Sequence, residues 1–160
     1  MRHIKHPFPA VADSKSRILI LGSVPSIKSV ENNFYYMHPK NRFWKVLSAI
    51  FGVDLYLTTI DERTSFLLEN GIALYDSVEE CDIESSKDSA ISNVVPADIP
   101  SLIAKSEISH IYCNGKASLH YLLSAYPKYE SITTLLPSTS PANARFSLEK
   151  LIEAWKVIIK

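Results

Sequence analysis

Four short runs of apolar, largely β-branched residues stand out along the chain, at residues 17–21, 72–75, 108–113 and 132–136. Runs of this kind are typical of strands that are buried on both faces of a sheet. The segments between them have the three- and four-residue apolar spacing of amphipathic helices. We expect helices over residues 43–51, 60–70, 97–105, 116–125 and 148–159.

Several of these helices have recognisable ends. Gly52 follows the first expected helix, and glycine tolerates the left-handed backbone that commonly ends a helix. Thr59 and Glu62 have the spacing of a capping box, and Gly71 follows that helix as a stop signal. Ser147 is a suitable N-cap for the last helix.

Residues 78–93 are polar and acidic, and they form the most loop-like stretch of the chain. The acidic side chains expected there on a solvated surface are Glu79, Glu80, Asp82 and Glu84. The remaining pattern, strands that alternate with helices, favours an α/β fold. We expect the strands to form a parallel sheet, because right-handed crossovers place the connecting helices on both faces of such a sheet.

In parallel sheets of this kind, ligands bind at the carboxyl ends of the strands. The residues to consider as a site therefore follow the four runs directly, at 22–26, 76–77, 114–115 and 137–141.

Length and composition narrow the picture. A chain of 160 residues with 46% hydrophobic residues can bury one core, so we expect one domain over residues 1–160, with residues 1–16 as an N-terminal extension. Lysine plus arginine equal aspartate plus glutamate at 17 each, so a nucleic-acid surface would have to be a local basic patch.

Neither a membrane span nor a secretion signal is visible. No apolar stretch approaches the roughly 18 residues of a span, and the N-terminal residues lack the apolar centre of a signal peptide. Cys81 and Cys113 are far apart and match neither a disulfide framework nor zinc-ligand spacing. We therefore expect a cytoplasmic protein that holds no metal.

The longest polar and aromatic segment follows the first run directly. Gly22, Ser23 and Ser26 allow a backbone to approach a ligand closely and offer amide and hydroxyl donors. Pro25 stiffens the same turn. Tyr36 offers a flat face on which a base could stack.

Two further polar residues of this segment each have two interpretations. Asn41 stands just before the helix expected over residues 43–51, and its amide could hold a water molecule or read a base edge. Equally, Asn41 could be only the N-cap of that helix. His38 has a side chain that carries protons near neutral pH, but no serine or cysteine is paired with it as in a catalytic triad.

A second polar segment, residues 135–147, combines three hydroxyls, two prolines and an asparagine at the end of the fourth run. A loop this polar beside a parallel sheet can wrap a phosphate or a base. It can also be an ordinary turn capped by serine and asparagine. Asn114 and Gly115, after the third run, are more often a turn than a site.

Together, three segments resemble the uracil-DNA glycosylase superfamily, and most closely its hypoxanthine-DNA (deoxyinosine) glycosylase branch. They are GSVPS at residues 22–26, YYMHPKNRFW at 35–44 and LPSTSPANAR at 136–145. Weaker similarity in ALYDSVEEC, VVPADI and CNG extends the match, in the same order, along nearly the whole chain after residue 16.

The resemblance implies a three-layer α/β/α sandwich with a central four-stranded parallel sheet. It also implies a DNA-repair enzyme that extrudes a deaminated base, foremost hypoxanthine, from DNA and hydrolyses its N-glycosidic bond with water. No metal or other cofactor is expected. The implied partner is DNA that contains deaminated bases, and the protein is expected to be a nucleoid-associated monomer without membrane contact.

The chain departs from the wider superfamily at two positions. Many members carry Asp or Asn where this chain has Val24, and a histidine where it has Ser138. Valine cannot position the attacking water, and the resemblance to the hypoxanthine branch passes that catalytic role to Asn41. Serine is a weaker donor to the leaving base, which argues against a fast general uracil enzyme.

The resemblance assigns the other candidates to two groups. The expected base pocket contains Gly22, Ser23, Pro25, Ser26, Tyr36, His38, Phe43 and Asn114, with Tyr36 stacked on the extruded base. The expected DNA contacts are Lys40, Arg42, Lys116, Ser138, Thr139, Ser140, Asn143 and Arg145.

Three alternatives stay open at this stage. A uracil-specific or mismatch-specific DNA glycosylase would keep the family and change the base. A non-catalytic nucleic-acid-binding domain of the same fold would account for Val24 and Ser138. An unrelated parallel-sheet enzyme that acts on a small phosphorylated metabolite fits the loop chemistry alone, but not the three collinear segments.

Overall fold

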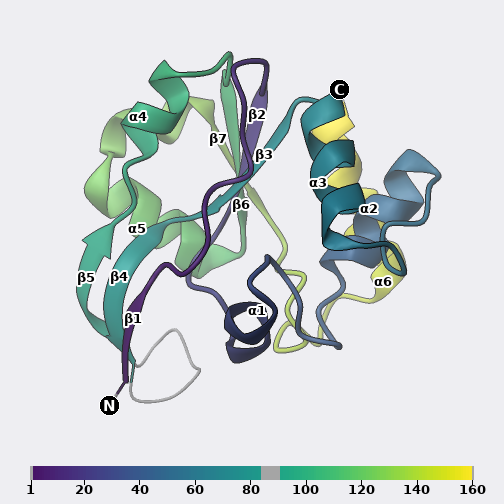
Figure 1. The fold of residues 1–160 in the computed structure, drawn as a ribbon, viewed down its shortest axis with the longest axis horizontal. Helices are drawn as coiled ribbons and strands as arrows, with labels where there is room; N and C mark the ends of the chain where they lie inside the picture. The colour runs from purple at the N-terminus through teal and green to yellow at the C-terminus, as the bar shows by residue number, and fades with distance from the viewer. Residues whose placement is uncertain (1, 84–90, 160) are drawn as a thin grey trace.

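A parallel sheet forms the centre of the protein in the computed structural model, which describes residues 2–83 and 91–159 (Figure 1). Its four strands lie in the order β3-β2-β6-β7, and all neighbours are parallel. They are β2 (Ile18–Gly22), β3 (Ile72–Asp76), β6 (His110–Asn114) and β7 (Thr133–Leu136). The four apolar runs are therefore confirmed as strands.

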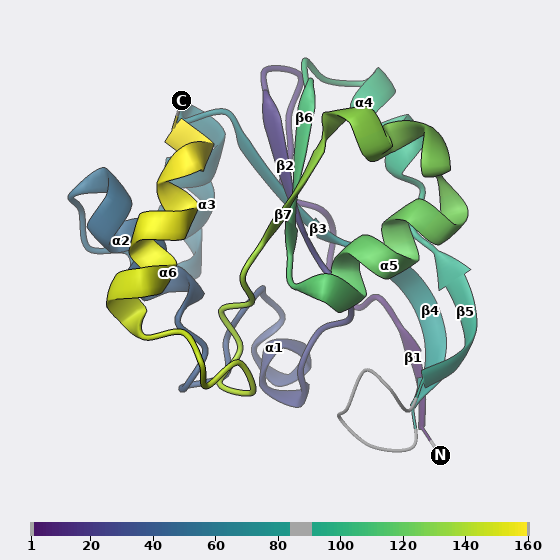
Figure 2. The same ribbon diagram turned by 180° about the vertical axis from the view of Figure 1, so that it is seen from behind.

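Helices cover both faces of this sheet, as Figures 1 and 2 show from opposite sides. One face carries α2 (Phe43–Phe51), α3 (Ile60–Glu69) and α6 (Leu148–Trp155), and the other carries α4 (Ile99–Ala104) and α5 (Lys116–Ala125). The expected three-layer α/β/α sandwich is confirmed. Within the described ranges, no helix has the length and apolar character needed to cross a bilayer.

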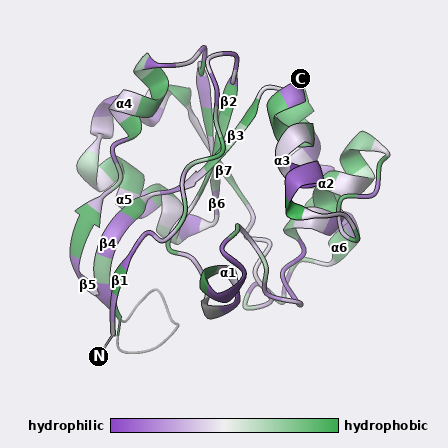
Figure 3. Ribbon diagram, viewed as in Figure 1, coloured by the Kyte–Doolittle hydropathy of each residue, from purple (hydrophilic) through white to green (hydrophobic). Residues whose placement is uncertain are grey.

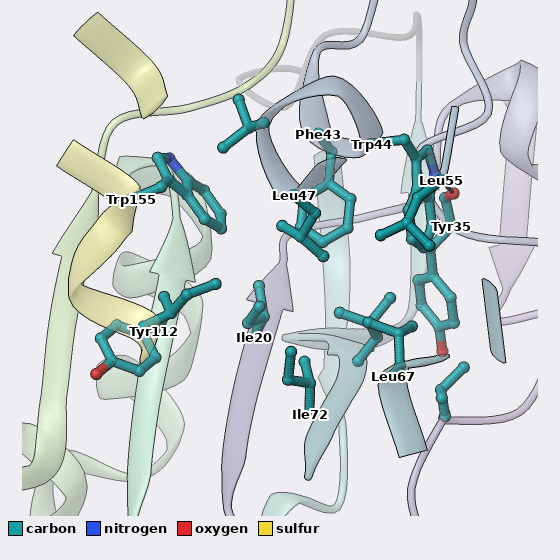
Figure 4. Packing of buried hydrophobic residues seen from close by; sticks show 14 of the residues in the cluster. Ile20, Tyr35, Phe43, Trp44, Leu47, Leu55, Leu67, Ile72, Tyr112 and Trp155 are labelled. Atoms are coloured by element: carbon teal, nitrogen blue, oxygen red, sulfur yellow. Dashed lines mark hydrogen bonds between the residues drawn. The ribbon is translucent and has the colours of Figure 1, made fainter. Parts of the chain in front are cut away.

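Successive strand residues point to opposite faces, so the sheet separates two hydrophobic cores. Ile20 and Tyr112 face the core under α2, α3 and α6, where Trp155 packs as well (Figure 4). Leu19 and Ile111 face the core under α4 and α5. Figure 3 shows the same division, because hydrophobic positions lie along the central strands and on the helix faces turned to them.

The helix ends predicted from the sequence are also observed. Gly52 ends α2 with a left-handed backbone at φ 68°. Thr59 and Glu62 form both bonds of a capping box at the start of α3. The Ser147 hydroxyl accepts a hydrogen bond from the backbone nitrogen of Lys150 and so caps α6.

A second, antiparallel sheet was not expected. Its order is β1-β4-β5, with β1 (Arg2–Lys5), β4 (Val78–Ile83) and β5 (Ile91–Pro96). The prediction of a loop over residues 78–93 was wrong for 78–83 and 91–93, whereas 84–90, including Glu84, lie outside the described residues.

The β4 strand was not predicted because its sequence is rich in acidic residues. Cys81 and Ile83 point into a small apolar cluster, while Glu80 and Asp82 point to the other side, where both contact the ring of His3 on β1. These partners are far apart in the sequence, so the pairing leaves no local signal.

The N-terminal residues are packed against the rest of the fold. Val11 exchanges two backbone hydrogen bonds with Leu74 on the outer edge of β3. Phe8 and Val11 are buried in the larger core. Residues 27–32, expected as part of a long loop, form the short helix α1 (Ile27–Asn32), which Ser26 caps.

Candidate active site

Two of the three segments singled out in the sequence, residues 35–44 and 136–145, meet the end of β6 at the carboxyl edge of the parallel sheet. The side chain that joins them is Thr139, which is fully buried in the loop after β7. Its hydroxyl accepts a hydrogen bond from Asn114 Nδ2 at 3.0 Å and donates to Asn41 Oδ1 at 2.8 Å. Its backbone nitrogen donates to Asn114 Oδ1 at 3.0 Å. The end of β6, the loop after β7 and the entrance of α2 are thus tied together.

Asn41 uses the two ends of its amide differently. Oδ1 accepts hydrogen bonds from the Thr139 hydroxyl and from the backbone nitrogen of Phe43, the latter at 2.9 Å. This oxygen satisfies a free N–H group at the start of α2, whose N-cap residue, Arg42, makes no side-chain cap. Nδ2 makes no hydrogen bond to any residue that the structure describes. The oxygen therefore stabilises the start of α2 and the loop after β7, and the nitrogen can donate to a ligand.

Arg42 holds the loop after β7 against the start of α2. Its guanidinium donates to the backbone carbonyls of Phe146, Ser140 and Asn143, the last two at 3.1 and 3.0 Å. Its backbone nitrogen donates to the carbonyl of Thr139 at 3.0 Å. These contacts indicate that Arg42 and Thr139, both expected to contact DNA, shape the loop that carries the other candidates.

The loop after β7 is also stabilised by its own polar groups. Asn143 Nδ2 donates to the carbonyl of Ser138, and the backbone nitrogen of Ser140 donates to the Ser138 hydroxyl. Gly115, at φ 96°, lets this loop approach β6, because a Cβ there would lie 3.1 Å from the Ser138 Cβ. Ser138, Ser140 and Asn143 are thus held in one conformation.

The turn after β2 passes close to the end of β3. A Cβ at Gly22 would lie 2.4 Å from Asp76 Oδ1 and 3.0 Å from the Tyr36 hydroxyl, so only glycine fits between them. Pro25 is buried, and Val24 packs against the apolar cluster of the second sheet. The valine at this position therefore has a packing role.

Tyr36 lies over Phe43, with ring centroids 4.1 Å apart and the rings stacked. Phe43 itself is fully buried. The Tyr36 hydroxyl is buried, lies near the Asn114 side chain and donates to no acceptor among the described residues. Burial raises its pKa, and the negative charge of Asp76 raises the pKa further, whereas a hydrogen bond with the Asn114 side chain lowers it; burial has the largest effect, so the hydroxyl stays protonated. The group is a buried donor without an acceptor.

His6 and Asp76 form a buried pair that the sequence did not indicate. Their side chains are 0% and 4% exposed, and His6 Nε2 lies 2.7 Å from Asp76 Oδ2. His6 Nδ1 lies 2.8 Å from the backbone oxygen of Phe8. The sequence could indicate Asp76 as a site residue, because it lies at the end of a strand. It could not indicate His6, which is brought to Asp76 by the pairing of β1 with β4.

The remaining candidates lie around this centre. His38 Nδ1 accepts a hydrogen bond from the backbone nitrogen of Lys40, at 3.1 Å. Lys40, Lys116 and Arg145 are exposed in the loops or at the helix start that surround Asn41 and Asn114. They place positive charge around Asn41 and Asn114 in a chain whose net charge is zero.

Metal-ligand clusters do not mark this centre in the described part of the chain. Among the described residues, no three His, Cys, Asp or Glu side chains are arranged to hold a metal ion. Two open depressions, of about 440 and 560 Å³, lie beside α3 and at the start of β2, and neither contains a predicted site residue. The candidate site is therefore defined by its hydrogen-bond contacts.

Comparison with known proteins identifies the family of the chain. The family model described as the uracil DNA glycosylase superfamily matches residues 8–158. The chain belongs to this superfamily. Proteins named hypoxanthine DNA glycosylase, from Methanosarcina acetivorans and Methanosarcina barkeri, are each 35% identical to it over 159 residues. The alignments cover 98% of this chain and 99% and 98% of those proteins.

A solved structure of this superfamily is similar as well. The solution NMR structure of a Methanosarcina acetivorans protein, described as a uracil DNA glycosylase, superimposes on this chain with a TM-score of 0.80. The two sequences are 32% identical. The match covers 99% of this chain and 100% of the other. The superfamily fold therefore extends over nearly the entire chain.

Proposed function

We propose that this protein is a monofunctional DNA glycosylase that removes hypoxanthine from deoxyinosine-containing DNA as a step of base excision repair. Membership in the superfamily supports the reaction, and the names of the two Methanosarcina relatives support the base. The observation that carries the proposal is the position of Asn41. Its Nδ2 is available at the point where the loops after β2, β6 and β7 meet.

The proposed reaction starts when the damaged nucleotide is extruded from the duplex, which costs least for a mispaired base. The glycosidic bond then breaks through an oxocarbenium-like sugar while negative charge develops on the departing base. Donors fixed around that base lower the barrier, because they gain most in the transition state. Asn41 Nδ2 supplies one such donor, or orients the water that attacks the sugar.

The proposed DNA contacts come from two kinds of residue. Exposed Lys40, Lys116 and Arg145 bind phosphates of the damaged strand. Arg42 and Thr139 hold the loop in place, so that its polar groups meet the strand in a fixed arrangement. We further propose that the chain acts as a single catalytic domain and as a monomer in the cytoplasm.

A base-release assay tests the function. Purified protein is incubated without metal with labelled duplexes that contain deoxyinosine, deoxyuridine, deoxyxanthosine or only normal bases, and alkali then reveals abasic sites. Strand breaks at deoxyinosine support the proposal. Release from deoxyuridine alone would keep the family and change the base, and binding without any release would indicate a non-catalytic domain.

Substitution of Asn41 tests the assigned role. Asn41→Ala is expected to abolish base release, and its loss of two hydrogen bonds should lower the free energy of unfolding by about 1–2 kcal/mol. Full activity of this variant would refute the assignment.

The variant Asn41→Asp separates the two possible roles of the nitrogen. It keeps the oxygen that accepts from Phe43 and Thr139 and removes only the N–H donors, so the fold is preserved. Retained base release would show that the side chain orients water, because a carboxylate can also accept from water. Lost release at unchanged melting temperature would show that it donates to the base.

A further inference from the structure

Arg63 on α3 is a charged side chain inside the protein. It is 6% exposed, and although burial lowers its pKa, a guanidinium in a protein keeps its proton. No acidic side chain among the described residues forms an ion pair with it. A buried charge without an opposite charge is unfavourable for stability. Its presence therefore indicates a role other than stabilising the fold.

The guanidinium of Arg63 contacts three different segments of the chain. Nη1 donates to Met37 Sδ at 3.2 Å, and Nη2 donates to the backbone oxygen of Tyr56 at 2.6 Å. The central carbon of the guanidinium lies 4.9 Å from the centre of the Trp44 ring, a cation–π contact that offsets part of the cost of burial. Arg63 therefore connects the turn before α2, α2 itself and the loop after α2.

The turn before α2 has a backbone conformation that must be held from outside. Tyr36 has φ 55°, in the left-handed region that is unfavourable for a residue with a large side chain. Trp44 Nε1 donates to the carbonyl of Tyr35 at 3.1 Å, and Arg63 donates to Met37, so the residues on both sides of Tyr36 are fixed. Such conformations persist only where the surrounding structure imposes them, and they are frequent at ligand-binding sites.

We propose that Arg63 is a positioning residue that keeps Tyr36 in the orientation in which its ring contacts the extruded base. Tyr36 is stacked on buried Phe43 and remains partly exposed, whereas Arg63 is too deeply buried to contact DNA itself. Without Arg63, the turn can relax to an ordinary backbone conformation and carry the Tyr36 ring away from Phe43. The proposal rests on the proposed function, because it assumes an extruded base beside Tyr36.

The shape of the guanidinium suits this role better than that of another side chain. Its planar fork donates to two acceptors on different segments and lies over an aromatic ring at the same time. The ammonium group of lysine supplies the charge and a donor without this fixed geometry, and methionine fills a similar volume with neither. Arg63→Met therefore removes the positioning contacts and the unfavourable buried charge together, so its effects on activity and on stability are expected to differ.

The test compares binding to two duplexes that differ at one nucleotide. One carries deoxyinosine fluorinated at the sugar 2′ position, so that the glycosidic bond resists cleavage. The other carries a tetrahydrofuran abasic analogue, which keeps the DNA backbone and has no base. The variants are Arg63→Met, Arg63→Lys and Tyr36→Ala. Arg17→Met is the matched control, because Arg17 also donates to a backbone oxygen, that of Asn70, but is exposed just before β2.

Arg63→Met is expected to lose affinity for the deoxyinosine duplex about five-fold or more, the effect of losing one aromatic contact to a base, and to bind the abasic duplex like the wild-type protein. Its melting temperature should equal or exceed that of the wild type, because the unpaired buried charge is removed. Arg63→Lys should recover part of the affinity, and Arg17→Met should bind both duplexes normally. The double variant Arg63→Met/Tyr36→Ala should lose no more than Tyr36→Ala alone, since Arg63 acts through Tyr36.

Three results would overturn the proposal. The first is an equal loss of affinity for both duplexes in Arg63→Met, which would show a merely structural role. The second is an unchanged ratio of the two affinities in Arg63→Met or Tyr36→Ala, and the third is a double variant whose loss is the sum of the single losses. If Arg63→Met does not fold, the same comparison in Arg63→Lys decides. Failure of the proposed function is distinguishable, because it is the absence of hypoxanthine release by the wild-type protein from ordinary deoxyinosine DNA.

Discussion

At the scale of single residues, two neighbouring tyrosines are used in opposite ways. The Tyr35 ring is buried, and its hydroxyl donates to the backbone oxygen of Pro9 at 2.8 Å. The Tyr36 hydroxyl is buried as well, but its proton has no acceptor among the residues described. A buried donor without an acceptor destabilises the fold. Its presence at position 36 therefore indicates a role in binding.

This contrast predicts different effects of the same substitution. Tyr35→Phe removes a formed hydrogen bond and should lower the free energy of unfolding by about 1 kcal/mol. Tyr36→Phe removes a donor without an acceptor and should leave the free energy of unfolding unchanged or raise it by up to about 1 kcal/mol. Urea denaturation measures both.

The two variants should also differ in activity. Base release is expected to fall in Tyr36→Phe and to stay near wild type in Tyr35→Phe at temperatures where both are folded. A Tyr36→Phe protein that is less stable than wild type would show that its hydroxyl has an acceptor in solution.

At the scale of elements, the site depends on one buried hydroxyl between three segments that follow different strands. Thr139 from the loop after β7 contacts Asn114 at the end of β6 and Asn41 before α2. Arg42 adds contacts from the start of α2 to the same loop. The strands and helices bring these segments together at one edge of the parallel sheet.

Thr139→Val keeps the shape of the side chain and removes the hydroxyl. Asn114 Nδ2 then loses its acceptor and Asn41 Oδ1 loses one donor, so the free energy of unfolding should fall by about 2 kcal/mol. Base release should fall about ten-fold or more, because Asn41 is no longer held in one orientation. Chemical denaturation and single-turnover kinetics measure the two effects.

Thr139→Ser is the matched control for this experiment. It keeps the hydroxyl, so it should retain most of the activity and most of the stability. Equal loss in the serine and valine variants would show that the methyl group, not the hydrogen bonds, is what the site needs.

At the scale of the whole molecule, the N-terminal segment connects the two sheets. β1 pairs with β4, and Val11 pairs with Leu74 at the edge of the parallel sheet. Between them, His6 reaches the end of β3 and Phe8 fills the larger core. The segment therefore contributes to the stability of the fold and to the candidate site together.

Deletion of residues 1–11 tests this dual role. Loss of the buried Phe8 and Val11 side chains alone should lower the free energy of unfolding by about 3–6 kcal/mol, at roughly 1.5–3 kcal/mol for each side chain. Base release should fall as well, because Asp76 at the carboxyl edge of the sheet loses the His6 side chain that contacts it. Thermal melting and the base-release assay report the two effects.

Phe8→Ala separates the two contributions, because it reduces the packing and keeps His6. It should lower the melting temperature and retain activity below that temperature. A truncated protein that melts and reacts like the full chain would show that the segment is dispensable.

Much of the fold could be predicted from local pattern. The strands at residues 18–22, 72–76, 110–114 and 133–136, the end of α2 at Gly52 and the cap at Ser147 depend on residues within one turn or one strand of each other. The sequence also identified the three loops of the candidate site, because loops that follow parallel strands must lie at the same edge of the sheet.

Only the tertiary structure decided how individual side chains are used. Asp76 meets His6 across 70 positions of the chain, and Arg42 meets Asn143 across 101. The polar stretch that forms β4 becomes a strand because β1 and β5 pair with it. Pairing between distant segments leaves no periodic signal in either one. The sequence alone therefore determined the layers of the molecule and the family, whereas the buried contacts around Asn41 and Asp76 followed only from the folded chain.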